Sequence, residues 1–294
     1  MELLLQLTVN GIALGAAYAL IALGFALVWS VTGVFHLAHG GVYVVSGYVI
    51  YLVAVQLRLP LAVAVVAAVA VAAALGWGIE RAIYEPLRRR GAKSLTLIVS
   101  SLATLIFLIN LAALIWGTEA RRFEDFAVIR GRPIGPAFIS GVEIAMIASG
   151  IVLFALTVAF LLYTRTGRAM RAVADNPAMA AIVGVNIRAI HSITYAMGAA
   201  LAVPAAFLIG LQHGLNPYAG MFAILIASAA AIVGGVGSVA GAALGAVLLA
   251  LAQNIGIWQL PSYWQESIAF GVLLAFIVLR PQGFFGAQAP GKGL

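Results

Sequence analysis

The chain has 294 residues, of which 64% are hydrophobic and only 9% are charged, and its formal net charge is +7. A soluble domain carries about 25% charged residues, so this composition excludes a soluble globular protein and indicates an integral membrane protein. The sequence contains no cysteine, which excludes disulfides and thiolate metal sites.

The first apolar tract, residues 3–57, contains no charged residue. At a rise of about 1.5 Å per residue it is too long for one helix across a hydrocarbon layer of about 30 Å. We therefore predict a retained first span over 3–29, a break, and a second span that ends near Leu57. The break contains glycines and the pair His36 and His39, which favours a discontinuous helix beside protein or a wet cavity.

Three further spans are predicted over residues 61–83, 95–116 and 144–164. The loops 81–93 and 165–190 carry an excess of Lys and Arg, whereas acids and bases are balanced in the loop 117–142. Two spans separate the basic loops, so these loops share one side, and the positive-inside rule makes it the cytoplasm. The loop 117–142 is then external. This charge pattern sets orientation in the membrane and gives no reason to expect nucleic-acid binding.

The tract from Ala189 to Gln265 also lacks charge and must cross several times. It predicts spans near 191–211, 218–234, 239–257 and 264–279. Small residues dominate around 234–238, which favours close helix packing or the lining of a path. Counting crossings places the C-terminal tail in the cytoplasm and the N-terminus outside, unless the 32–41 break is re-entrant. We expect one transmembrane domain, 1–294, an all-α polytopic membrane bundle of about eight or nine transmembrane helices with broken helices.

Within the loop 165–190 the sequence predicts a short helix. Asn176 can cap it, Pro177 suits its first position, and Gly184 can end it in a left-handed conformation. A two-turn helix between spans has little to pack on within its own loop, so we expect it to dock on a partner. The plainer alternative is a solvated basic loop. The residues expected to take part are Gly167, Arg168, Arg171, Asp175, Asn176, Pro177, Met179, Ala180, Ile182 and Gly184.

The residues that several kinds of transport or catalysis require are missing from this sequence. No acid lies within 3–57, 144–164 or 189–265, which argues against a proton-coupled or sodium-coupled carrier. His36 and His39 supply only two of the roughly three protein ligands that a catalytic metal site needs, so neither a metal nor a cofactor is expected. Hydrolase motifs and a phosphate-binding loop are missing from the sequence. Uphill transport would therefore need energy from a partner.

Several segments share a pattern in order and spacing: the opening run 10–24, the His39-Gly40 break, the loop from Gly167 to Asn186, the Asn216-Pro217 turn and the run 234–242. Together they resemble the bacterial branched-chain amino acid ABC permeases, the H-type subunit of the Liv system. The resemblance runs nearly end to end, although the external loop 117–142 differs in detail from the family.

The resemblance implies a fold similar to type II ABC importer permeases and a multi-pass protein of the bacterial inner (cytoplasmic) membrane that is not itself an enzyme. It implies four partners: a second related permease in a heterodimer, two cytoplasmic ABC ATPase subunits and a periplasmic substrate-binding protein. The loop 165–190 would then enter a groove on the ATPase. The substrate path, suited to Leu, Ile or Val, is expected near His36, His39, Gly40, Tyr43, Gly234, Gly235, Gly237 and Ser238.

Three alternatives stay open at this point. The substrate could be urea or a short amide, because permeases for these compounds look much alike. The chain could be a channel or facilitator that needs no ATPase, which would pass solute in both directions without ATP. An intramembrane enzyme could use His36 and His39 with a metal, which metal analysis of the purified protein would decide.

Overall fold

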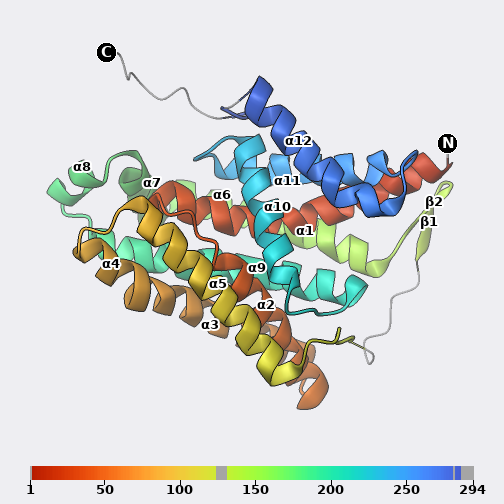
Figure 1. Cartoon of the computed structure of the whole chain (residues 1–294), viewed down its shortest axis with the longest axis horizontal. Coiled ribbons are helices and arrows are strands. Elements are labelled where there is room, and N and C mark those ends of the chain that lie inside the picture. The colour runs from red at the N-terminus through yellow and green to blue at the C-terminus, as the bar shows by residue number, and fades with distance from the viewer. Residues whose placement is uncertain (1, 124–130, 281, 286–294) are drawn as a thin grey trace.

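The computed structural model of the chain describes residues 2–123, 131–280 and 282–285. Helices make up nearly all of the regular structure there, and β1 (Arg132–Ile134) pairs antiparallel with β2 (Ala137–Ile139) in a small hairpin (Figure 1). The predicted all-α fold class is therefore confirmed. The helices are α1 (Glu2–Thr32), α2 (His39–Tyr51), α3 (Leu61–Ile79), α4 (Glu85–Arg89), α5 (Ser94–Trp116), α6 (Gly141–Tyr163), α7 (Arg165–Asp175), α8 (Pro177–Ile182), α9 (Ile187–His213), α10 (Ala219–Gly234), α11 (Val239–Gly256) and α12 (Gln265–Leu279).

Two helices continue through π-helical turns, so they are longer than their labels suggest. The π turn Leu52–Gln56 extends α2, and the π turn Glu80–Tyr84 joins α3 to α4. In the described part of the chain, 8 helices are long and apolar enough to cross a membrane, and the shorter apolar helix α10 adds a ninth segment. The sequence analysis expected eight or nine spans, which agrees with the 8 helices counted alone and with the count that includes α10.

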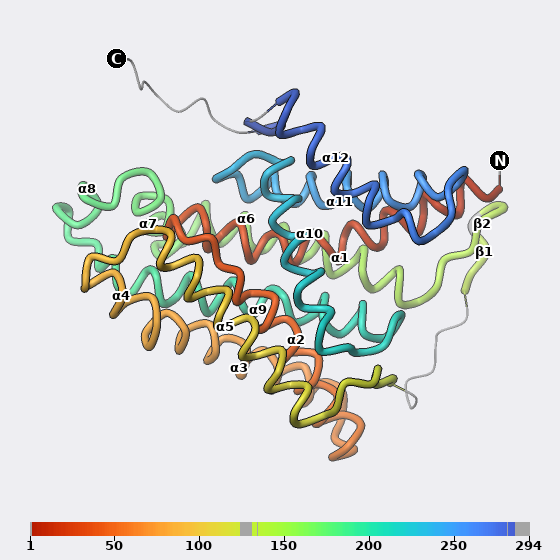
Figure 2. Tube along the Cα trace, viewed as in Figure 1, coloured from red at the N-terminus to blue at the C-terminus, as the bar shows by residue number. Residues whose placement is uncertain are grey.

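The bundle has two ends of different character. The basic end carries the turn after α4 and the helices α7 and α8, which are brought together when Arg188 at the start of α9 pairs with Glu85 of α4. The opposite end carries the β hairpin, where Gln6 of α1 bonds the backbone of Phe138 (Figure 2). The loops 81–93 and 165–190 thus lie together at one end of the bundle, away from the residues 131–142. Residues 124–130 of the loop 117–142 lie outside the described residues, and the assignment of the two ends to the cytoplasm and the exterior stays a prediction.

Helix α1 runs through the middle of the bundle and packs on α11, α9, α6 and α10 (Figure 1). Small residues permit this close packing. A Cβ on Gly15 would collide with the backbone of Val247 in α11, and one on Gly198 of α9 would collide with the carbonyl oxygen of Gly24. The outward faces of α5, α6 and α12 remain largely exposed and apolar, as expected for helices that face lipid or a second subunit.

The predicted break in the first apolar tract is present. Helix α1 ends at Thr32, and the non-helical residues 33–38 turn back into the bundle before α2 begins at His39. The His39 ring lies against Gly24 of α1 and reaches the carbonyl oxygen of Ile21, so α2 starts about two to three helical turns inside the basic end of α1.

Helix α10 also begins deep inside the bundle, and the first turns of α2 and α10 meet. Gly40 and Gly220 lie so close that a Cβ on either glycine would collide with the carbonyl oxygen of the other. The chain reaches α10 from the opposite end, where Leu215 and Arg121 exchange backbone hydrogen bonds. The first turns of α2 and of the shorter helix α10 therefore meet in the interior, next to the non-helical residues 33–38, and irregular backbone in the interior is a feature of transporters, where it lines a protein-enclosed path.

Candidate functional site

The loop 165–190 folds as two short helices, α7 and α8. Thr164 Oγ1 accepts from the Gly167 amide at 2.9 Å and caps α7, and Asn176 Oδ1 accepts from the Met179 amide at 3.0 Å and caps α8. Gly184 follows α8 with a φ of +87°, a left-handed conformation that favours glycine. The predicted cap, first-turn proline and glycine stop are confirmed, and the helix over Arg165–Asp175 is an addition that the sequence reading did not include.

Helix α8 packs on its own chain, contrary to the expectation that it would have little to pack on. Ala180 is buried, in a cluster with Met170 and Val173 of α7, Ile190 of α9 and Leu27 of α1. Ala180 therefore orients α8 on the bundle and offers no surface to a partner. Gly167 also has a structural part, because a Cβ there would collide with the carbonyl oxygen of Phe160.

The other face of α8 and the residue that follows it carry apolar side chains that are largely exposed. Met179, Ile182 and Val183 are 60%, 77% and 76% exposed. The remaining residues expected to take part in docking, Arg168, Arg171, Asp175, Asn176, Pro177 and Gly184, are exposed as well. An apolar patch held in place by two caps and a buried alanine, within a basic surface, is typical of an interaction site.

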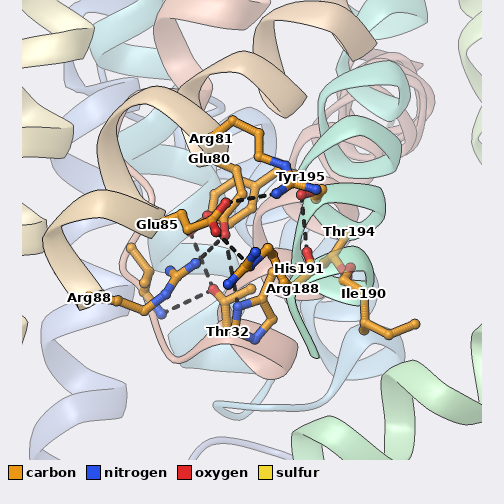
Figure 3. A network of polar contacts seen from close by, with 12 residues as sticks. Thr32, Glu80, Arg81, Glu85, Arg88, Arg188, Ile190, His191, Thr194 and Tyr195 are labelled. Carbon is orange, nitrogen blue, oxygen red and sulfur yellow. Dashed lines mark hydrogen bonds and ion pairs between the residues drawn. The ribbon is translucent and has the colours of Figure 1, made fainter. Parts of the chain in front are cut away.

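Beside these helices lies an ion-pair cluster (Figure 3). Glu85 accepts from Arg81 at 2.9 Å, from Arg89 at 2.7 Å and from Arg188 at 2.6 Å. Arg188 comes from α9, directly after α8, whereas the other two guanidinium groups come from the α3–α4 helix. Glu85 therefore ties the end of the loop 165–190 to the end of the α3–α4 helix.

A second carboxylate in the cluster, Glu80, is fully buried and was missed as a site residue by the sequence reading. It pairs with Arg88, and the His191 ring nitrogen Nδ1 lies 3.9 Å from its Oε1 (Figure 3). The sequence reading placed Glu80 near the end of the span 61–83, next to the basic loop 81–93, and gave it no role. The spacing of Glu80, Tyr84 and Arg88 at intervals of four residues was the available signal, because such residues share one face of a helix.

A line of buried polar and aromatic side chains leads from this cluster to the start of α2. Tyr84 shares a 2.9 Å hydrogen bond with His36 Nδ1, and the Tyr195 ring lies edge-on to the His36 ring at 4.9 Å between centroids. The His36 and His39 rings are 5.9 Å apart, and His39 Nδ1 has no hydrogen-bond partner in the described chain. The described residues contain no group of three or more potential metal ligands. The hydrogen bonds of the two rings go to the Tyr84 hydroxyl and to the carbonyl oxygen of Ile21.

A cavity of about 620 Å³ opens toward the opposite end of the bundle. Residues of α1, α2, α9, α10 and α11 line it, among them Leu14, Tyr18, Ile21, Tyr43, Phe222 and Gln253. Of the lining residues of α1, Ile21 lies furthest toward the basic end, and its carbonyl oxygen binds the His39 ring. The cavity and the buried polar line therefore approach the same point of α1 from the two ends of the bundle.

The eight residues expected along a path lie in three separate places. Tyr43 lines the cavity, whereas His36, His39 and Gly40 are buried at the start of α2 without lining it. The other four form the α10–α11 turn. There Ser238 Oγ caps α11 by accepting from the Gly241 amide at 2.9 Å, Gly234 packs on Gly241, and Gly235 and Gly237 adopt φ values of +110° and +89°.

Comparison with known proteins agrees with this architecture. Residues 7–278 match the family model described as the permease component of branched-chain amino acid transport systems. The chain is 34% identical to the high-affinity branched-chain amino acid transport system permease protein BraD of Pseudomonas aeruginosa, over 96% of this chain and 95% of the relative. It is 33% identical to the corresponding protein LivH of Escherichia coli, over the same shares of each chain.

A more distant relative is the probable branched-chain amino acid transport permease protein LivH of Methanocaldococcus jannaschii. It is 25% identical over 92% of this chain and 88% of the relative. The similarity in each case covers nearly the whole length of the chain, and so includes α2, α10 and the loop 165–190. No solved structure matches the chain.

Proposed function

This chain belongs to the family of branched-chain amino acid transport system permease components, and on that premise we propose that it forms half of the path of an ATP-driven importer for leucine, isoleucine and valine. It is a multi-pass protein of the bacterial inner membrane, built from helices that are long and apolar enough to cross. The observation that carries the substrate class is full-length similarity to two permeases of high-affinity branched-chain amino acid systems.

The chain itself is a transport subunit, and we assign ATP hydrolysis to two cytoplasmic ATPase subunits. The basic end faces the cytoplasm in this proposal, in accord with the positive-inside rule. The ATPase docks on the exposed face of α8, where Met179, Ile182 and Val183 stand clear of the bundle. A helix of six residues is not stable alone in water, so its rigid seat on Ala180 serves to present this face.

The remaining partners are a second permease subunit and a periplasmic binding protein. A second, related permease covers part of the exposed apolar surface of the bundle and supplies the other half of the path. A periplasmic binding protein delivers substrate to the end that carries the β hairpin. ATP binding moves α8, and the Arg188–Glu85 ion pair passes that motion to the α3–α4 helix. No covalent chemistry takes place in this chain.

The experiment that tests this function is uptake by proteoliposomes that contain the chain with its partner subunits, ATP and the binding protein. Radiolabelled leucine should accumulate against its gradient, and urea should neither accumulate nor compete. Accumulation of urea or an amide in place of leucine would assign the other substrate class. Equal leucine flux in both directions without ATP would establish a channel and overturn the importer.

A further inference from the structure

The cavity at the end opposite the basic loops contains polar groups that have no partner within the protein. Gln253 of α11 is 2% exposed, Tyr43 of α2 is 6% exposed and Tyr18 of α1 is 7% exposed, and all three line the cavity. None of the three side chains makes a side-chain hydrogen bond in the described structure that would use its amide or hydroxyl group. Because these side chains line the cavity, their amide and hydroxyl groups are available to a ligand or to ordered water.

The charged groups of the lining have one sign. Glu143 of α6 and Glu266 of α12 belong to the lining, and no Lys or Arg does so among the described residues. Glu143 accepts from Ser140 through Oε2 in the cap of α6, and the side-chain amide of Asn10 lies 3.1 Å from its Oε1, while Glu266 lies at the exposed start of α12. Two carboxylates without a cation favour a ligand that carries an ammonium group.

A complementary positive region lies deeper in the cavity. Ala219, Phe222 and Ala223, from the first turn and a half of α10, line it. The N-terminal end of a helix carries a partial positive charge, and broken helices in transporters direct such ends at anionic substrate groups. The amides of Ala219 and Met221 bond the carbonyl oxygens of Asn216 and Tyr218, so the partial charge of the helix end is what α10 offers to the cavity. Between the two regions, Leu14, Ile21 and Ile209 provide an apolar wall.

We propose that this cavity is a binding site for a zwitterionic α-amino acid with an aliphatic side chain, contained within this one chain. The carboxylate of the ligand lies toward the start of α10, its ammonium group toward Glu143 and Glu266, and its side chain against the apolar wall, with Gln253 and Tyr43 as hydrogen-bonding partners. The volume of about 620 Å³ falls within the usual range of small-molecule pockets, about 300–1,000 Å³. The inference rests on the proposed function for its substrate class.

The site can be tested in the full chain, because the protein contains no cysteine. Ala219→Cys places one thiol in the cavity, and Phe138→Cys places one on the exposed hairpin at the same end of the bundle. In spheroplasts washed free of periplasmic protein, free leucine should slow labelling of the Ala219→Cys variant by an impermeant thiol reagent and leave the Phe138→Cys variant unchanged. Leucinamide, which lacks the carboxylate, and 4-methylpentanoate, which lacks the ammonium group, should protect far less.

A matched pair of second substitutions decides whether the named residues form the site. Gln253→Met, added to Ala219→Cys, should raise the leucine concentration for half-maximal protection about tenfold, the effect of one lost hydrogen bond to a charged group. Gln56→Met, the same change at an exposed residue outside the cavity, should leave it unchanged.

The proposal is overturned if leucine gives no protection, if all three ligands protect equally, or if Gln253→Met has no effect. When uptake of leucine by the ATP-driven complex is normal and protection is missing, the proposed function stands and only the site fails. When the complex takes up urea and only urea protects Ala219→Cys, the substrate class of the proposed function fails instead. Protection by the binding protein in the absence of leucine, with none by leucine alone, would assign the cavity to a side chain of that protein and also overturn the amino-acid site.

Discussion

Arg188 Nε lies 2.6 Å from Glu85 Oε1, and this ion pair joins two loops that are separated by two membrane spans in the sequence. Arg188 lies in the first turn of α9, the helix after α8, and Glu85 begins α4, so the ion pair links the segment that follows α8 to the end of the α3–α4 helix. Glu85 also holds Arg81 and Arg89, which fixes its carboxylate in position for Arg188 (Figure 3). The two basic loops therefore form one surface.

The first prediction concerns the strength of that connection. Glu85→Gln should lower the thermal unfolding midpoint of the purified protein more than Arg188→Gln does, because it leaves three guanidinium groups without their carboxylate. Combining both changes should cost little beyond Glu85→Gln alone, since the contact is already lost. Glu119→Gln, at an exposed acid on the other side of the bundle, is the control and should have no effect. Fully additive losses would show that the pair contributes nothing.

The second prediction concerns orientation. Arg90→Cys lies beside the ion-pair cluster, and Glu119→Cys lies at the opposite end; both positions are exposed. An impermeant maleimide added to intact cells that are permeable only in their outer membrane should label the Glu119→Cys variant and spare the Arg90→Cys variant. Labelling of both variants after the cells are broken is the control for reactivity. The reverse pattern would mean that the basic end faces outward.

The third prediction concerns the contact between the first turns of α2 and α10. Gly40→Ala should destabilise the protein by about 1–3 kcal/mol, because the added Cβ collides with the carbonyl oxygen of Gly220 and the backbones must separate. Gly271→Ala is the matched control, since it lies in a helix with no atom within 4 Å of the new Cβ. It should be neutral or slightly stabilising, because alanine suits a helix better than glycine. Equal thermal midpoints for the two variants would show that α2 and α10 do not pack closely.

Much of this architecture was predictable from the sequence because it depends on local signals. Length and hydropathy located the spans, the Lys and Arg bias paired the basic loops, and Asn176, Pro177 and Gly184 marked the ends of α8. Each of these signals determines the structure of its own segment, and contacts with distant segments do not change that structure.

The features that the sequence did not reveal depend on contacts between distant segments. Glu80 lies near the end of a predicted span, where the sequence gives it no partner, and it is buried because a π turn continues the helix and His191 of α9 lies beside it. Ala180 looks like an exposed helix residue and is buried by α1, α7 and α9. The cavity unites residues of α1, α10 and α11, whose proximity no local pattern encodes.

The central claim is that the exposed face of α8 binds an ATPase subunit, and co-purification measures this most directly. The variant Met179→Asp with Ile182→Asp puts two charges on that face and leaves Ala180 in place, so α8 should stay seated on the bundle. Phe138→Asp, at an exposed apolar residue of the hairpin, is the control for charge and membrane insertion. We predict that the double variant reaches the membrane in normal amounts and loses the ATPase subunits during purification, whereas the Phe138→Asp variant retains them. A double variant that still retains the ATPase subunits would contradict the claim, and the loop 165–190 would then be only a solvated basic loop.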